Sequence, residues 1–256
     1  MASGRTPRTA GVTAAKKAVR STARAAALAL TGAIQAAPAG AQDRWSLFGD
    51  LAAYSDRADR GLSLSDIDPT ATVAGEAVYR LDGTAGELFG GAQAGYVQDL
   101  AGRDVQLTGY LGWVRQFGGA YDLSVTLYAD SFHGDGSSRV YGEGRAAVAR
   151  DFGLLYVRGG VGLAPDGRWS DPDGRTVYPF AEVQAPVPTK PWLTVLAGWG
   201  YSAIARGADR SDWFAGIAAT KGDVELSLRY VDTGAETGPP ARLGRARAVA
   251  ALRWYF

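Results

Sequence analysis

The sequence contains no cysteine, a single histidine, His133, and a single methionine. Without cysteine the chain can form neither disulfide bonds nor thiolate metal sites, and it offers no cysteine nucleophile. Histidine supplies most zinc ligands and most general acid and base groups, so one histidine leaves little scope for metal or hydrolytic chemistry. These absences argue against most enzymes, and we expect neither a cofactor nor a metal ion.

Long hydrophobic runs are also missing from most of the chain. Beyond residue 41 there is no apolar stretch long enough for a transmembrane helix, which needs about 18 residues or more. If this part of the chain enters a bilayer, only a closed barrel can satisfy its backbone polar groups.

Residues 1–41 have the character of an export signal. They hold six basic residues and no acid, then an alanine-rich stretch from Ala25 to Ala37 and a small-residue triplet from Ala39 to Ala41. This pattern predicts a cleaved signal peptide, with an amphipathic surface helix as the alternative. The remaining residues 42–256 carry 21 basic and 26 acidic residues, a net charge of −5. A mildly acidic chain has no basic surface for nucleic acid.

From Arg44 onward, apolar and polar residues alternate with a period of two, which is typical of strands with one apolar face. The clearest example runs from Tyr121 to Ser131. Segments of about ten to thirteen residues recur along the chain, the length that tilted transmembrane strands require. We predict twelve strands, over residues 44–56, 70–80, 86–97, 104–117, 120–131, 139–150, 153–163, 175–185, 191–203, 211–220, 223–232 and 245–256.

The predicted connections alternate between long and short. The long ones are Arg57 to Pro69, Gln98 to Arg103, Phe132 to Ser138, Ala164 to Gly174, Ile204 to Arg210 and Thr233 to Gly244. The short ones are Leu81 to Ala85, Gly118 to Gly119, Asp151 to Phe152, Pro186 to Lys190 and Lys221 to Gly222. Outer-membrane barrels have short periplasmic turns and long outside loops, so this rhythm predicts an antiparallel up-and-down transmembrane barrel with both termini in the periplasm. A soluble β-sandwich has no reason to alternate long and short connections along the chain.

Aromatic residues provide an independent test, because a bilayer barrel carries aromatic rings at both water interfaces. On the predicted lipid-facing positions they cluster near the strand ends, with aliphatic residues between them. The residues assigned to these girdles include Trp45, Trp113, Tyr121, Trp199, Tyr201, Trp213, Tyr230 and Trp254. The alternative is an aromatic core in a soluble barrel, which would scatter the rings along the strands.

The chain ends in Phe256, in step with the apolar positions Ala248, Ala250 and Leu252. A terminal aromatic residue in this phase resembles the signal that the outer-membrane assembly machinery recognises. The alternative is an apolar final strand in another kind of barrel.

One segment resembles a known family. Tyr54, Ser55 and Asp56 are followed by Arg60 to Asp66, reading RGLSLSD, and by Pro69. This is similar to the "SDY.FRG.S.SD..PA" signature of the TorF-type family of outer-membrane porins. Val224 to Asp232 and Arg247 to Phe256 resemble the last two strands of that family. The resemblance implies an outer-membrane location and a porin-like role, and it transfers no catalytic residue.

If apolar positions face lipid, many charged residues face the lumen. They are Asp50, Glu76, Arg80, Glu87, Asp122, Asp130, Glu143, Arg145, Arg158, Glu182, Glu225, Arg229, Arg245, Arg247 and Arg253. Mixed charges of this kind tune ion preference in channels. We predict a constriction at mid-height formed by Arg145, Arg158, Glu182, Arg229 and Arg247. The alternative is that acids and bases pair across a narrow lumen and fill it.

The predicted outside loops are rich in aspartate and glycine. Asp166 to Asp173 lacks the spacing and the closing glutamate of a calcium loop, so turn formation is the better interpretation. Ser131, His133 and Asp135 offer the residue types of a lipid hydrolase, but no nucleophile elbow accompanies them.

The leading hypothesis from sequence is therefore a passive porin-like channel for small solutes or ions. A closed structural or adhesive barrel that acts through its outside loops is the first alternative, and an outer-membrane lipid hydrolase is the second. The expected partners are outer-membrane lipid and lipopolysaccharide, the assembly machinery and small solutes, and not nucleic acid. The sequence gives no basis for assigning an oligomeric state.

Overall fold

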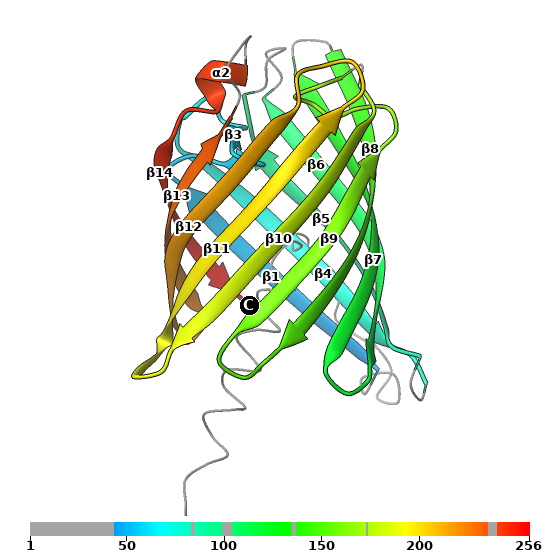
Figure 1. The fold of residues 1–256 in the computed structure, drawn as a ribbon, viewed down its shortest axis with the longest axis vertical. Coiled ribbons are helices and arrows are strands. Elements are labelled where there is room, and N and C mark those ends of the chain that lie inside the picture. The colour runs from blue at the N-terminus through cyan, green and yellow to red at the C-terminus, as the bar shows by residue number, and fades with distance from the viewer. Residues whose placement is uncertain (1–43, 83–84, 99–103, 135–136, 173, 235–239) are drawn as a thin grey trace, which may run out of the picture.

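A computed structural model describes residues 44–82, 85–98, 104–134, 137–172, 174–234 and 240–256. The predicted signal peptide lies outside these residues. Twelve tilted strands form one closed barrel (Figure 1). Their bounds are β1 Trp45–Tyr54, β4 Thr70–Arg80, β5 Glu87–Tyr96, β6 Val105–Phe117, β7 Tyr121–Gly134, β8 Ser137–Asp151, β9 Tyr156–Ala164, β10 Thr176–Val187, β11 Lys190–Ile204, β12 Arg210–Lys221, β13 Val224–Thr233 and β14 Arg247–Tyr255.

Each strand pairs antiparallel with its neighbours along the chain, and β1 pairs with β14 to close the ring. The seam extends to the last residue, because the backbone N–H and C=O of Phe256 bond to Gly49 at 2.8 Å each. A side chain at Gly49 would meet the Phe256 ring, so glycine makes room for it there. The predicted all-β, antiparallel, up-and-down barrel of twelve strands is confirmed.

The alternation along the strands separates two faces. On β6 and β7 the outward Leu111 and Leu127 have exposed fractions of 62% and 61%, whereas the inward Tyr110 and Thr126 have 8% and 5%. The outward face is therefore an apolar band that none of the described residues covers, and polar and charged groups are held inside. Among the described residues no helix is long and apolar enough to span a membrane.

The barrel has two different ends. At the turn end lie the short hairpins, the start of β1 and the end of β14, and at the loop end lie the longer connections (Figure 1). One predicted long connection is wrong. The hairpin of β7 and β8 continues through the pairs Phe132 with Arg139 and Gly134 with Ser137, because Phe132 packs inside the barrel and its strand stays paired.

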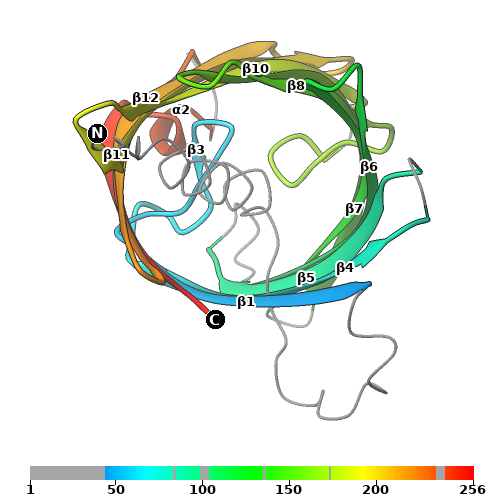
Figure 2. The same ribbon diagram turned by 90° about the horizontal axis from the view of Figure 1, so that it is seen from below.

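Two further predictions about the loop end need correction. The connection from Arg57 to Pro69 is not an outside loop: it forms the short strands β2 Ala58–Asp59 and β3 Leu62–Ser63, which lie within the ring of barrel strands (Figure 2). Helix α2, Pro240–Leu243, lies beside them. Arg245 is exposed and precedes β14, so it is not part of the inward-facing wall.

Candidate functional site: the lumen and its plug

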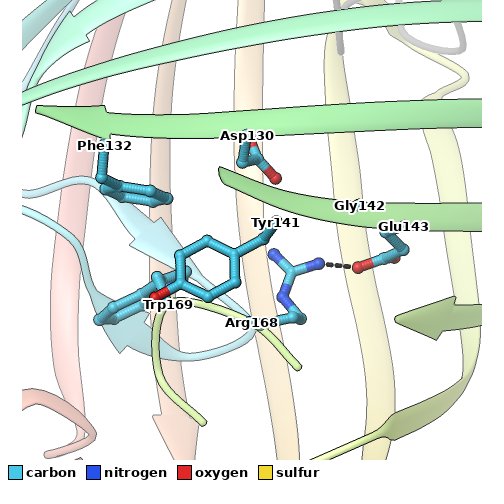
Figure 3. A pocket seen from close by; sticks show the side chains of 7 residues that line it. All are labelled: Asp130, Phe132, Tyr141, Gly142, Glu143, Arg168 and Trp169. Atoms are coloured by element: carbon cyan, nitrogen blue, oxygen red, sulfur yellow. Dashed lines mark ion pairs between the residues drawn. The ribbon is translucent and has the colours of Figure 1, made fainter. Parts of the chain in front are cut away.

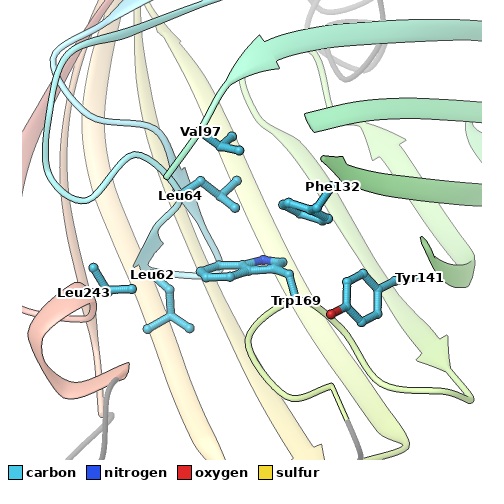
Figure 4. Packing of buried hydrophobic residues seen from close by; sticks show 7 residues of the cluster. All are labelled: Leu62, Leu64, Val97, Phe132, Tyr141, Trp169 and Leu243. Carbon is cyan, nitrogen blue, oxygen red and sulfur yellow. The ribbon is translucent and has the colours of Figure 1, made fainter. Parts of the chain in front are cut away.

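Three segments pack together in the loop end of the lumen, and we call them the plug: residues 57–68, residues 168–171 and α2. Their apolar side chains form a buried cluster with residues of the barrel wall (Figure 4). The cluster consists of Leu62, Leu64, Val97, Phe132, Tyr141, Trp169 and Leu243. Phe132 lies on β7 and Val97 directly follows β5, and both side chains are fully buried. The hydrophobic effect therefore holds the plug inside the barrel.

Asp56 anchors the start of the plug. Its carboxylate accepts hydrogen bonds from Ser63 at 2.5 Å and Ser65 at 2.9 Å, and from the Nε of Arg247 on β14 at 2.5 Å. The Asp56 side chain is 3% exposed, so this ion pair is removed from water. The backbone between Asp56 and Ser63 turns at Gly61, whose φ of 75° suits glycine. The Gly61 carbonyl also accepts a hydrogen bond from Arg247.

A second ion-pair network ties the plug to β8. The Glu143 carboxylate, with a side chain 3% exposed, accepts from Arg60 at 2.6 and 2.7 Å. It also forms an ion pair with the guanidinium group of Arg168 (Figure 3) and another with that of Arg145. Gly162 on the next strand leaves room for this carboxylate, because a Cβ there would lie 2.7 Å from Glu143 Oε1. One buried acid thus joins three cations from three segments.

Asp59 joins two segments of the plug, residues 57–68 and residues 168–171. It accepts from Arg168 at 2.6 Å and from the indole N–H of Trp169 at 3.0 Å. Burial alone would raise the pKa of Asp59, but the positive charges of Arg168 and Arg60 and the Trp169 hydrogen bond outweigh burial. Together they hold the pKa of Asp59 well below its ordinary range, so the carboxylate stays ionised at neutral pH.

A narrow gap remains between the plug and the wall (Figure 3). It is lined by Asp130, Phe132, Tyr141, Gly142, Glu143, Arg168 and Trp169. Several buried polar atoms of this region have no hydrogen-bond partner among the described residues, including Arg60 Nε, Arg168 Nε and the Tyr141 hydroxyl. Such atoms are costly unless water reaches them, so the packing of the plug is incomplete on its polar side.

The five residues predicted to form a constriction fall into two groups. Arg145 and Arg247 belong to the networks that hold the plug. Arg158 and Glu182 lie farther from the loop end, opposite each other on β9 and β10, with 3.5 Å between their charged atoms. Arg229 lies over the Phe214 ring, and its buried Nε has no hydrogen-bond partner in the described structure. A constriction formed by this set stays a prediction.

Sequence reasoning missed the residues that build the plug, above all Asp59, Arg60, Arg168 and Trp169. A signal was present, because Leu62 and Leu64 alternate with serines inside a segment otherwise rich in charge. Apolar residues in period two indicate a half-buried strand, here one that packs inside the barrel instead of forming its wall.

The predicted girdle residues lie on the outward face. Trp45, Trp199, Trp213, Tyr230 and Trp254 have exposed fractions between 42% and 50%. Trp113, Tyr121 and Tyr201 are less exposed and also alternate outward.

The hydrolase residues lie on β7 near the loop end. The Ser131 hydroxyl and His133 Nε2 are 2.5 Å apart. Both alternate with the lumen-facing Phe132 and therefore point away from the lumen. Asp135 lies outside the described residues. Within the described ranges no three histidine or acidic side chains gather in a way that would hold a metal ion.

Comparisons with known proteins find likeness in fold alone. No protein-family model matches the chain, and no curated protein matches it either. Among solved structures, the KdgM porin in complex with disordered oligogalacturonate has a TM-score of 0.53 at 6% identity, covering 82% of this chain and 99% of its own. A second KdgM porin structure has a TM-score of 0.51 at 7% identity with the same coverage. A chain from work on the in-meso crystallisation of membrane proteins has a TM-score of 0.53 at 10% identity, covering 82% and 83%. The chain thus has the fold of twelve-stranded porin-like barrels.

Proposed function

We propose that this protein is a porin-like channel of the bacterial outer membrane, which lets small solutes or ions diffuse passively and carries a plug at its outer end. The observation that carries the proposal is the division between the two faces of the wall. Apolar side chains such as Leu111 and Leu127 face outward without cover, whereas the charged Arg158 and Glu182 face the lumen with side chains 24% and 34% exposed. An apolar outside with a wet, charged inside is the arrangement of membrane channels.

The remaining parts of the proposal concern location and assembly. Residues 1–41 act as a cleaved signal peptide, the turn end faces the periplasm, and the loop end meets lipopolysaccharide. Phe256 serves as the assembly signal, and the eight girdle residues lie at the membrane interfaces. The likeness of fold to the KdgM porin supports this setting.

We also propose membership of the TorF-type family. Support comes from the role of the segment that resembles its signature. Asp56, Ser63 and Ser65 from that segment form the buried anchor around Arg247, so these residue types have a structural reason to occur together.

Planar-bilayer recording of the purified, refolded protein tests the channel. We expect stepwise conductance that scales with salt concentration. The matched variant is Asp59→Asn, which removes the charge that faces Arg168 and Arg60, and we expect a larger or less interrupted conductance because the plug is held less firmly. Inserted protein that stays silent in both forms would contradict the proposal.

The plug itself favours a second candidate, a closed structural barrel. A buried apolar cluster combined with two buried ion-pair networks is the expected structure of a permanent seal. The same recordings separate the two. Conductance in the unaltered protein supports the channel, and conductance only in Asp59→Asn supports a closed barrel whose seal the mutation breaks.

A further inference from the structure

The outward face of the barrel carries very few charges, and their positions are not random. Among the described strands, the charged side chains on the outward face are Arg115, Arg150, Lys190 and Lys221 at the turn end and Asp232 at the loop end. All four at the turn end are cations. An uncompensated charge facing lipid costs about 2 to 4 kcal/mol at the bilayer midplane and about 0 to 1 kcal/mol near the interface. A cation is therefore tolerated at the interface, where the phosphate groups of lipids can pair with it.

Arg150 is the most constrained of these cations. It is the last outward residue of β8, directly opposite Tyr121 at the start of β7. Its guanidinium lies over the Tyr121 ring at 4.7 Å and over the Phe152 ring at 4.5 Å. It also donates to the Tyr121 hydroxyl. Two aromatic rings thus fix the plane of the guanidinium and lower the entropy that binding would cost.

The hydrogen-bonding capacity of Arg150 is far from used. Within the described residues the guanidinium donates only to the Tyr121 hydroxyl, through Nη1, and no carboxylate forms an ion pair with it. Arg115 adds a second exposed cation on the strand at the other side of β7, two positions from Phe117, which stacks on Tyr121 at 5.6 Å. The surface around them is apolar, with Phe152 and Leu154 at 56% and 68% exposed.

We propose that Arg150, clamped between Tyr121 and Phe152 and assisted by Arg115, binds the phosphate of a phospholipid at the turn end of the barrel. A guanidinium presents a planar fork that matches phosphate oxygens. The exposed Phe152 and Leu154 then lie beside the acyl chains. This inference rests on the proposed membrane setting, and it names one lipid site within it.

Native mass spectrometry of the full chain in uncharged maltoside micelles tests the site, with short-chain phosphatidylglycerol as the probe. We expect one tightly retained phospholipid per chain. Arg150→Gln lowers retention about tenfold, the effect of losing one charged hydrogen-bond interaction. Arg150→Lys gives an intermediate loss because an ammonium lacks the fork. Lys221→Gln removes an outward cation at the same end without an aromatic clamp and leaves retention unchanged.

Three outcomes would overturn the proposal. Equal retention of a phosphate-free diacyl glycolipid would mean that acyl contacts alone hold the lipid. Displacement of the lipid by millimolar inorganic phosphate would assign the site to the free anion. Equal retention by Arg150→Gln and Lys221→Gln would mean that no special site exists at Arg150. Bilayer conductance of Arg150→Gln is recorded in parallel, so that loss of the lipid site with conductance intact counts against this inference and leaves the channel standing.

Discussion

The two ends of the barrel use ionic groups in opposite ways. At the turn end, Arg44 and Asp82 form an ion pair at 2.8 Å whose side chains are 48% and 83% exposed. At the loop end, Arg247 and Asp56 form one at 2.5 Å whose side chains are 10% and 3% exposed. The strands that lead to both ends belong to the same wall. The difference arises because the plug fills the lumen at the loop end and removes Arg247 and Asp56 from water.

This contrast has an energetic consequence. An exposed ion pair contributes little because water screens it and its long side chains lose entropy. A buried pair is costly to form, and breaking it leaves an uncompensated charge in the interior. The loop end should therefore respond strongly to single substitutions, and the turn end should not.

The largest effect is expected from a substitution that breaks the anchor of the plug. Asp56→Ala removes the carboxylate that pairs with Arg247 and accepts from Ser63 and Ser65. We expect the free energy of unfolding to fall by about 3 to 5 kcal/mol. Denaturant unfolding of the protein in lipid vesicles, followed by tryptophan fluorescence, measures it. The matched variant Asp82→Ala at the turn end should show no measurable change, and equal losses in the two variants would refute the comparison.

The next effect, with a lower minimum, is expected from the apolar part of the plug. Leu62 is 1% exposed and packs in the buried cluster, so Leu62→Ala should cost about 2 to 5 kcal/mol. Leu111→Ala on the outward face should cost less, because lipid chains refill the space that the side chain leaves. Susceptibility of residues 57–68 to added protease distinguishes local release of the plug from unfolding of the barrel. A resistant Leu62→Ala plug would show that the ion pairs hold it without the cluster.

The smallest effect is a dependence on pH. Because folding lowers the pKa of Asp59, the unfolded chain binds a proton more readily than the folded one, and stability rises with pH in that range. The contribution of Asp59 to stability is complete above the ordinary aspartate pKa of about 4 and is lost progressively as the pH falls below that value. Conductance should therefore change little from pH 6 to pH 4 and increase as the pH falls below 4, because an Asp59 released from Arg168 and Arg60 takes up a proton that the docked one does not. Asp59→Asn should lose most of this dependence, whereas a pH response unchanged in that variant would assign it to another group.

Local sequence pattern is sufficient to predict the wall of the barrel. The strand from Thr70 to Arg80 was predicted with the bounds that the structure shows, and the others differ mainly at their ends. The physical reason is that each strand has one apolar and one polar face, and this requirement appears locally as a period of two. The placement of Leu111 and Leu127 outward, and of Arg158 and Glu182 inward, follows from that pattern alone.

Tertiary structure alone decided what occupies the lumen. Nothing local to Asp59 shows that Arg168, distant in sequence, will lie 2.6 Å from it, and nothing local to Asp56 points to Arg247. A polar segment between two strands has the same composition whether it meets solvent or folds inward. Whether it folds inward depends on partners from β5, β8 and β14 that only the closed barrel brings within reach, since burial of charge is favourable only where an opposite charge is already in place.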